Sequence, residues 1–500
     1  MKSEDRNSAK ELYKDLRRRS WTQLWDEEVP RFDAAPAERR AAIIRAVGVV
    51  FAESGAAEEK ENVREWLHAR LRDPEEKIRR YAIAAIPKIG GGADEEQKLL
   101  SALRSASGDS EKKILARSLG KIGGTATLEH GIDAKIEQKV KAGLARQQSP
   151  SAVRTEAVLA EFAQLRIHLR GRNGLEKFVG EEVQQSKIGR EKFRVADVLP
   201  GCVVIVPIAP FSIADIYSMR CFGTVGFILG SDKTGFAEGL ASVITSELSR
   251  RLFRTFTEGT IRYRINYVAK GHQRAAVNQL ASRVYAQCPE ILNDARSVTW
   301  TSDIYSDSRG QTVELRPNMT PDPRFAYRRQ DVPAASHPQL AACLARLAGD
   351  YLNNIIWDPF CGSGSELIES ALLGGVRGVY GTDTSSVAIK IAEANYAASG
   401  AAPVPAKFIC GDFRTASLGG AEPTLIITNP PMGMRVQVAS LKQLIADLFR
   451  TAARVLKPGG RLVLVNPLSR QPETPLLKLQ FQQTVDMGGF NCRLEKYLKA

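Results

Sequence analysis

The stretch that decides the fold of the C-terminal region is Ile355-Ile356-Trp357-Asp358-Pro359-Phe360-Cys361-Gly362-Ser363-Gly364. A short apolar run ends at an acidic residue, a glycine-rich turn follows, and residues 365–373 have a helical pattern. This order predicts a strand, a tight turn and a helix. Such a turn brings backbone N–H groups and a helix N-terminus close to a ligand, although many purely structural turns look alike.

The same alternation continues toward the C-terminus. Strands are predicted at 355–357, 376–382, 407–410, 425–428 and 461–466, and helices at 339–347, 366–373, 387–397 and 441–455. Repeated strand–helix–strand units predict an α/β fold with a mostly parallel sheet. Polar residues stand at four strand ends, namely Asp358, Asp383, Asp412 and Asn429. Because ligands bind at the carboxyl ends of such strands, we expect a common site there rather than four unrelated caps.

Several of these positions suit a nucleoside-like ligand. Gly362 and Gly364 let the backbone approach a ligand without a Cβ clash. Asp383 ends the second strand, where a carboxylate can accept both hydroxyls of a ribose. Asp412 ends the third strand, where its carboxylate would accept from an adenine amino group while Phe413 lies against the ring.

The stretch from Asp358 to Gly364, followed by Asn429-Pro430-Pro431, resembles the motif pair of the S-adenosylmethionine-dependent amino-methyltransferases. The resemblance covers residues 336–500 and implies a Rossmann-like methyltransferase domain. It implies cofactor-binding roles for Asp358, Phe360, Gly362, Gly364, Asp383, Asp412, Phe413 and His337. It implies catalytic roles for Asn429, Pro430, Pro431 and Met432.

The acceptor implied by this resemblance is an exocyclic amine, which is a poor nucleophile because its lone pair is delocalised into the base. The Asn429 side-chain oxygen and the Pro430 carbonyl can each accept one N–H bond and so aim the lone pair at the methyl group. Consecutive prolines make this turn rigid. Met432 departs from the family pattern, which has an aromatic residue there; a thioether still contacts a ring face, but stacking is weaker.

Residues 1–150 are predicted to be all-helical. The motif Lys-Ile-Gly-Gly occurs at residues 88–91 and again at 121–124, an offset of 33 residues that is typical of helical repeats. These segments resemble HEAT-type repeats. Such a stack offers a surface for a protein partner, and simple packing without a ligand is an equal alternative.

Residues 160–318 are predicted to be mixed α+β, with strands at 165–170, 203–206, 261–268, 298–305 and 311–315 and helices at 174–183 and 273–287. This region resembles the RNA-binding THUMP module found ahead of some RNA methyltransferase domains. Residues 319–335 are predicted to be an extended linker. Basic side chains in and around these segments are candidate RNA contacts, namely Arg250, Arg251, Arg254, Arg262, Arg264, Lys270, Arg328, Arg329 and Arg435.

The composition fits an RNA-binding protein of a reducing compartment. The formal net charge is +14, which favours a polyanionic partner. The seven cysteines are scattered without a Cys/His cluster, which argues against a metal site or disulfides and favours a cytoplasmic location. The apolar runs are too short to span a membrane.

Together these patterns predict an enzyme that methylates an exocyclic amine in structured RNA. The THUMP-like region favours guanine N2 of tRNA over adenine N6. Guanine-N2 or adenine-N6 methylation of rRNA, and adenine methylation of DNA, remain alternatives within the enzyme class. The alternative from another class is a non-catalytic RNA-binding or scaffold protein with a relic methyltransferase fold.

Overall fold

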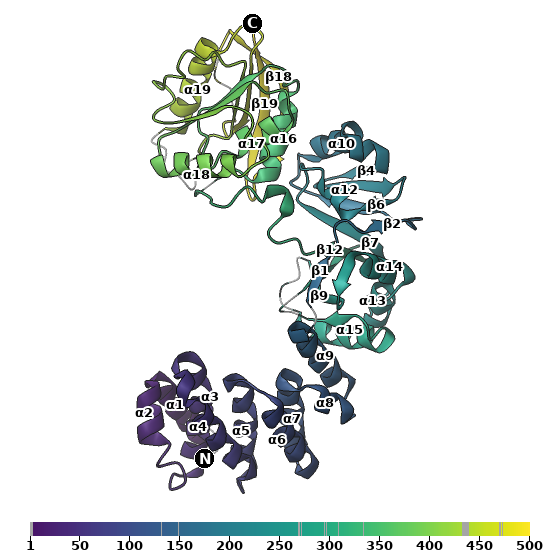
Figure 1. Ribbon diagram of the computed structural model, residues 1–500, viewed down its shortest axis with the longest axis vertical. Coiled ribbons are helices and arrows are strands. Elements are labelled where there is room, and N and C mark those ends of the chain that lie inside the picture. The colour runs from purple at the N-terminus through teal and green to yellow at the C-terminus, as the bar shows by residue number, and fades with distance from the viewer. Residues whose placement is uncertain are drawn as a thin grey trace. The chain divides into compact units, whose positions relative to one another are not determined.

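The computed structural model describes residues 4–131, 133–148, 150–268, 271, 273–294, 296, 298–308, 310–333, 335–432, 440–469, 472 and 474–500 (Figure 1). The chain forms two compact units, each built from two segments of the sequence. The first consists of residues 1–152 and 231–311, and the second of residues 153–230 and 312–500. The predicted middle region is thus divided between the two units. Among the described residues, no helix combines the length and apolar character needed to cross a membrane.

The first unit begins with a stack of helices, which confirms the predicted all-α segment. Its longer helices are α1 (Glu4–Arg18), α3 (Ala37–Ser54), α4 (Lys60–Ala69), α5 (Glu76–Ile89), α6 (Ala93–Ser105), α7 (Asp109–Ile122) and α9 (Ala134–Gln148), and its short ones include α2 (Trp21–Gln23) and α8 (Thr125–Glu129). α3 packs on α5, α5 on α7 and α7 on α9. α5 and α7 begin 33 residues apart and have 14 residues each.

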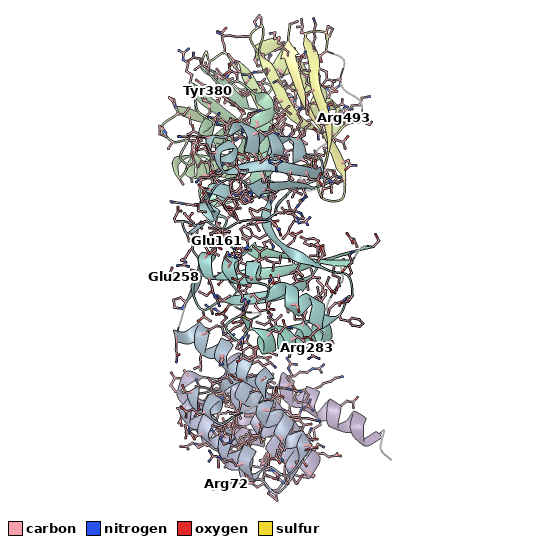
Figure 2. All side chains as sticks on the ribbon, turned by 90° about the vertical axis from the view of Figure 1, so that its right-hand side faces the viewer. Arg72, Glu161, Glu258, Arg283, Tyr380 and Arg493 are labelled. Carbon is pink, nitrogen blue, oxygen red and sulfur yellow. The ribbon has the colours of Figure 1, made fainter. Side chains whose placement is uncertain are left out.

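Buried apolar side chains hold this stack together, because each helix turns one face inward. Ile83 of α5 and Leu115 of α7 are both fully buried in this core. The outer surface has charged side chains, Arg72 among them (Figure 2).

The rest of the first unit is a small α/β segment. Strand β9 (Arg262–Tyr267) pairs in parallel with β10 (Leu292–Asn293) and with β11 (Trp300–Asp307). Three helices accompany them, namely α13 (Ala237–Ile244), α14 (Glu247–Phe256) and α15 (Arg274–Gln287). α9 packs on α15 and β10, and Arg146 forms an ion pair with the buried carboxylate of Asp294 at 2.6 Å. The helical stack is therefore joined to this segment by packing, because residues 153–230 separate the two in sequence.

The second unit opens with a mostly antiparallel sheet in the order β12-β7-β3-β5-β4. Its strands are β3 (Ile167–Arg170), β4 (Phe193–Leu199), β5 (Cys202–Pro207), β7 (Thr224–Asp232) and β12 (Gly310–Pro317), and its helices are α10 (Glu176–Gln185), α11 (Lys187–Lys192) and α12 (Ile213–Tyr217). β3 pairs antiparallel with both β5 and β7. The predicted strands at 165–170, 203–206 and 311–315 are confirmed.

The C-terminal sheet has the order β15-β14-β13-β16-β17-β19-β18. Its strands are β13 (Ile355–Asp358), β14 (Gly378–Asp383), β15 (Ala406–Cys410), β16 (Leu425–Thr428), β17 (Arg461–Asn466), β18 (Leu477–Asp486) and β19 (Asn491–Lys499), and its helices are α16 (Pro338–Ala348), α17 (Ser365–Leu372), α18 (Ser386–Ala397) and α19 (Leu441–Val455). β13 to β17 are parallel, as predicted. The antiparallel pair β18–β19 extends the sheet from β17 and was not predicted; Tyr380 lies on β14 and Arg493 on β19 (Figure 2).

The strand order reverses at β13, because β14 and β15 lie to one side and β16 and β17 to the other. Doubly wound sheets bind their ligands at such a switch point, beyond the carboxyl ends of the strands. The site predicted from the strand ends therefore lies at this switch point, beside the carboxyl end of β13.

Residues 319–335, which precede α16, were expected to form an extended linker. That expectation was wrong for their central part, around Arg324 and Tyr327, because it is packed. The guanidinium of Arg324 is buried and donates to the carbonyls of Met219, Phe222 and Gly223 at 3.0–3.3 Å. Tyr327 is also buried and donates to Glu369 of α17 at 2.7 Å. These contacts fix the segment between the antiparallel sheet and the C-terminal sheet within the second unit.

Candidate active site

The first side of the site is the glycine-rich turn between β13 and α17. Gly362 and Gly364 both have left-handed backbones, with φ of 49° and 83°, which explains why glycine occupies these positions. The Gly362 N–H donates to Asp383 Oδ2 at 3.1 Å, and the Ser385 N–H donates to Oδ1 at 2.9 Å. Each carboxylate oxygen of Asp383 keeps one lone pair. Two ribose hydroxyls can therefore still donate to it.

Asp412 has a comparable arrangement at the end of β15. Its Oδ1 accepts from the backbone N–H of Arg414 at 2.9 Å, and its Oδ2 accepts from the Arg414 guanidinium at 2.7 Å. Arg414 also donates to Asp447 at 2.8 Å, so the carboxylate of Asp412 is held in place. The rings of Phe360 and Phe413 meet beside it with centroids 4.8 Å apart.

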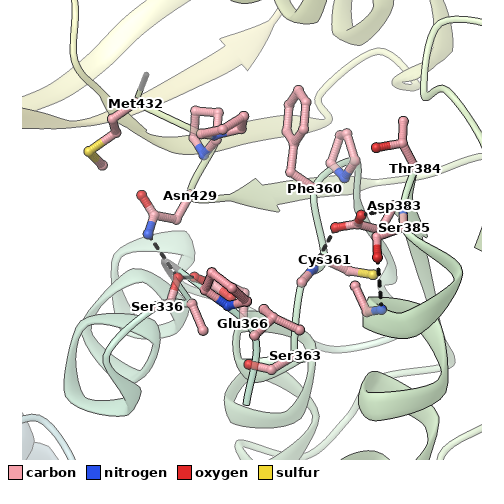
Figure 3. Close-up of a pocket in the computed structure, with 18 of the residues that line it drawn as sticks. Ser336, Phe360, Cys361, Ser363, Glu366, Asp383, Thr384, Ser385, Asn429 and Met432 are labelled. Atoms are coloured by element: carbon pink, nitrogen blue, oxygen red, sulfur yellow. Dashed lines mark hydrogen bonds between the residues drawn. The ribbon is translucent and has the colours of Figure 1, made fainter. Parts of the chain in front are cut away.

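The second side of the site is the Asn429-Pro430-Pro431-Met432 turn that follows β16. Asn429 donates through Nδ2 to the hydroxyl of Ser336 at 2.8 Å, and Ser336 in turn donates to the buried carboxylate of Glu366 (Figure 3). The Asn429 side-chain oxygen is buried and has no hydrogen-bond partner among the described residues. It is thus a buried acceptor available to a ligand N–H.

A single cavity of about 1140 Å³ joins the two sides. Both groups of predicted residues line it, namely Phe360, Gly362, Asp383, Asp412, Phe413 and His337 on the first and Asn429, Pro430, Pro431 and Met432 on the second. Its volume is sufficient for a nucleoside-sized ligand with a second ring beside it.

Asp358 and Gly364 do not line this cavity. Asp358 is fully buried and accepts hydrogen bonds from the Thr428 hydroxyl at 2.6 Å and from the Phe360 N–H at 3.0 Å. This placement does not fit the predicted direct contact of Asp358 with a cofactor. It fits a supporting role, because the carboxylate ties the glycine-rich turn to the end of β16.

Burial shapes the ionisation of the groups beneath the cavity. Desolvation raises the pKa of Asp358 well above its usual range, and the nearby charge of Glu366 adds to this. Desolvation also raises the pKa of Glu366, against the hydrogen bond from Ser336. The pKa of His337, an exposed residue, is lowered first by partial desolvation and then by the charges of Arg172 and Arg328. The imidazole is therefore neutral at neutral pH.

The cavity also includes residues that the sequence patterns did not single out. Arg172, from the loop between β3 and α10, lies on its wall. Met487, Gly488, Gly489 and Phe490 come from the turn between β18 and β19. Cys492 of β19 contacts the sulfur of Met432 at 3.7 Å, so this hairpin borders the proline turn. The absence of an aromatic residue at position 432 is the sequence signal that could have prompted a search for an aromatic ring elsewhere, such as Phe490.

The candidate RNA contacts differ in their exposure and in their ion pairs. Arg250 and Arg254 lie on the outer side of α14 and pair with Glu247 at 3.2 Å and Glu290 at 2.7 Å. Arg251 shares that side, since Leu252, Phe253 and Phe256 face the core. In the second unit, Arg328 pairs with Asp331, and Arg329 is exposed. Lys270 and Arg435 lie outside the described residues.

Arg262 and Arg264, both predicted RNA contacts, lie on β9 and differ in exposure. Arg264 is exposed and donates to Thr301 at 3.1 Å, as expected. Arg262 is only 3% exposed, because this end of β9 pairs with β10, against which α9 packs. A surface contact of Arg262 with RNA does not fit this burial.

One group of possible metal ligands occurs among the described residues, namely His68, Asp94 and Glu95. Arg64 pairs with Glu95 at 2.7 Å, and Lys98 contacts both Asp94 and His68. Burial lowers the pKa of His68, and the charge of Lys98 lowers it further. These contacts describe an ion-pair network rather than a metal centre.

Comparison with known proteins agrees with this geometry. Residues 326–495 match the family model described as RMKL-like, methyltransferase domain. The crystal structure of TrmN from Thermus thermophilus superimposes with a TM-score of 0.52 at 21% identity, covering 67% of this chain and all of that one. SMU.472, solved with SAH, gives a TM-score of 0.52 at 15% identity and covers 69% and 99% of the two chains. The C-terminal region has a methyltransferase fold.

Two curated relatives match part of the chain. A tRNA (guanine(6)-N2)-methyltransferase of Thermus thermophilus is 30% identical over 194 residues, or 38% of this chain and 57% of the relative. A tRNA (guanine(10)-N2)-dimethyltransferase of Methanothermobacter thermautotrophicus is 29% identical over 181 residues, or 36% and 49%. The chain therefore spans about half the length of the curated relatives it matches.

Proposed function

We propose that this protein transfers the methyl group of S-adenosylmethionine to the N2 amine of a guanine in tRNA. The observation that supports this most directly is the buried oxygen of Asn429, which has no hydrogen-bond partner within the described part of the chain. It lies at one side of a cavity whose other side carries Asp383. One side offers an acceptor to an amine, and the other offers acceptors to a ribose. Both curated relatives are named as tRNA guanine-N2 enzymes, which favours this acceptor over adenine N6.

The cofactor would be held by Gly362, Asp383 and Asp412, with Phe360 and Phe413 beside its adenine. When bound, it supplies an electrophilic methyl group on a sulfonium. The protein contributes position rather than proton transfer. Asn429 Oδ1 and the Pro430 carbonyl each accept one N–H of the acceptor amine, which directs the nitrogen lone pair toward the methyl group. The proton leaves only after transfer, when the nitrogen has become acidic.

The acceptor base must leave any stack to enter the cavity. Phe490 lines the cavity on the side of Met432 and offers the ring face that position 432 lacks. Arg172, on the same wall, offers a charged donor to the base or to its phosphate. The acceptor half of the site thus draws residues from three separate segments.

We infer that the α3–α9 layer is a HEAT-type repeat stack and offers a surface to a protein partner. Residues 160–318 would act as the THUMP-like RNA-binding region, with Arg250, Arg251, Arg254, Arg264 and Arg329 on exposed or partly exposed surface. The domain at 336–500 completes this division. We expect the protein to act in the cytoplasm.

Mass spectrometry of nucleosides from a deletion strain tests this function. The expected result is loss of N2-methylguanosine from tRNA, with rRNA nucleosides unchanged, and its return when the gene is restored. Loss of N6-methyladenosine, or a change confined to rRNA, would contradict the proposed acceptor. No change in any methylated nucleoside, together with no binding of S-adenosylmethionine in calorimetry, would favour the relic scaffold.

A further inference from the structure

We propose that Ser336 and Glu366 act as positioning residues that fix the side-chain amide of Asn429 with its oxygen toward the acceptor amine. This inference rests on the proposed function. It adds two residues from outside the proline turn, one just before α16 and one in the first turn of α17. Figure 3 shows the Asn429 nitrogen directed at Ser336, and Ser336 donates to Glu366.

The number of available protons determines the direction of the two hydrogen bonds that link Asn429, Ser336 and Glu366. A hydroxyl has one proton, and once that proton is donated to a carboxyl oxygen the lone pairs of the hydroxyl remain free to accept. Ser336 donates its proton to Glu366 Oε1, so its oxygen lone pair accepts from Asn429 Nδ2 at 2.8 Å. An amide has chemically opposite ends, and the reverse orientation would place its nitrogen toward the cavity. That orientation would offer donors where the amine also has donors.

The consequence is a fixed acceptor in the cavity. With its nitrogen bound by Ser336, Asn429 leaves its oxygen buried without a partner among the described residues. A buried acceptor left unpaired is unfavourable, and an incoming N–H removes that cost. The site is thereby preorganised for an amine before the acceptor enters.

The burial of Glu366 argues against simple packing. Its side chain is 3% exposed, and burial of a carboxylate is unfavourable unless charge or hydrogen bonds compensate. Its position in the first turn of α17 favours negative charge, and Arg328 contributes in the same direction. Its carboxylate accepts the side-chain hydrogen bond of Ser336, which is itself 9% exposed. A cap of the helix alone would require neither Ser336 nor a contact to Asn429.

Single-turnover kinetics with S-adenosylmethionine and tRNA test this inference. In Ser336→Ala, the methyl-transfer rate should fall about tenfold or more, because the Asn429 amide is no longer fixed and no longer orients the acceptor amine. The dissociation constants of cofactor and tRNA should change less than twofold. Glu366→Gln keeps an acceptor for Ser336 and should retain most of the rate, whereas Glu366→Ala should lose it as Ser336→Ala does.

The matched control is Ser370→Ala, which truncates a buried serine on the same helix away from the cavity. Its rate should equal that of the unaltered protein. A rate for Ser336→Ala within twofold of that control would overturn the inference. If the unaltered protein transfers no methyl group to RNA, the proposed function fails instead.

A second measurement requires no activity. The side-chain NH₂ signals of Asn429, assigned in the full chain by their absence in Asn429→Ala, should shift upfield and exchange faster in Ser336→Ala. They should stay in place in Ser370→Ala. Unchanged Asn429 signals in Ser336→Ala would show that Ser336 does not hold the amide, and would overturn the inference independently of turnover.

Discussion

The carboxylate of Asp383 accepts a hydrogen bond from the backbone N–H of Gly362 at 3.1 Å. This bond joins the end of β14 to the glycine-rich turn after β13, so β13 and β14 together form one wall of the site. The remaining lone pairs of Asp383 face a cavity that also contains Asn429. The two halves of the site are therefore positioned by the same sheet.

Asp383→Ala should weaken binding of S-adenosylmethionine roughly tenfold or more, because hydrogen bonds to a charged group contribute about 1.5–3 kcal/mol. Calorimetry with the full chain measures this directly. Glu393→Ala removes an exposed carboxylate from the neighbouring helix α18 and should leave the affinity unchanged. Equal affinities in the two variants would exclude Asp383 from cofactor binding.

Phe490→Ala should raise the KM for tRNA about tenfold, because stacking of a base on an aromatic ring is worth about 1–3 kcal/mol. The affinity for cofactor should not change, since Phe490 belongs to the hairpin side of the cavity. Leu352→Ala serves as the control, because this side chain is 71% exposed and does not line the cavity. A normal KM and a normal kcat in Phe490→Ala would show that the acceptor base does not stack on this ring.

The alternation of strands and helices around the site was predictable from sequence. Residues 425–428 and 461–466 form β16 and β17 as expected, because Pro and Gly delimit these apolar runs. The hairpin β18–β19 was missed, although Leu477, Leu479 and Phe481 alternate with polar residues. Its polar face resembles that of a solvent-exposed segment, and no helix separates the two strands.

The supporting contacts of the site could not be predicted in the same way. Ser336 lies 93 residues before Asn429, and no local pattern records a hydrogen bond over that distance. The burial of Arg262 could not be predicted for a similar reason. Alternation along a strand places a side chain on one face, but it does not show which element covers that face. The arginine of the supposed linker, Arg324, is buried by aromatic rings and backbone carbonyls that only the fold brings together.

Arg324→Ala should destabilise the second unit by about 3–5 kcal/mol, because three carbonyls and the carboxylate of Asp322 would lose a buried cationic donor. Differential scanning calorimetry should show a lower melting temperature. Arg329→Ala, five residues later and exposed, should leave it unchanged. Identical melting curves would show that the packed segment contributes little to stability.

The pH dependence of stability should reflect Asp358. Its pKa is raised in the folded state, mainly by burial, so the folded protein keeps this proton at pH values where the unfolded chain has lost it. Stability therefore falls as the pH rises above the ordinary aspartate value of about 4 and continues to fall until Asp358 ionises in the folded state. A tenfold difference in acidity between the two states corresponds to about 1.4 kcal/mol.

Asp358→Asn removes this proton but keeps an oxygen for Thr428 and the Phe360 N–H. Its melting temperature should decline less steeply than that of the unaltered protein when the pH is raised from about 4 to 8. Asp197→Asn, at an exposed position, provides the reference. Parallel curves for all three proteins would contradict the assignment to Asp358.

The central claim is that the side-chain oxygen of Asn429 receives an N–H of the acceptor amine. Single-turnover methyl transfer to tRNA by Asn429→Ala, with cofactor affinity measured on the same preparation, tests it most directly. We predict a rate at least about a hundredfold lower, because the amine loses its orienting acceptor, with cofactor affinity nearly unchanged. An unchanged rate would contradict the claim.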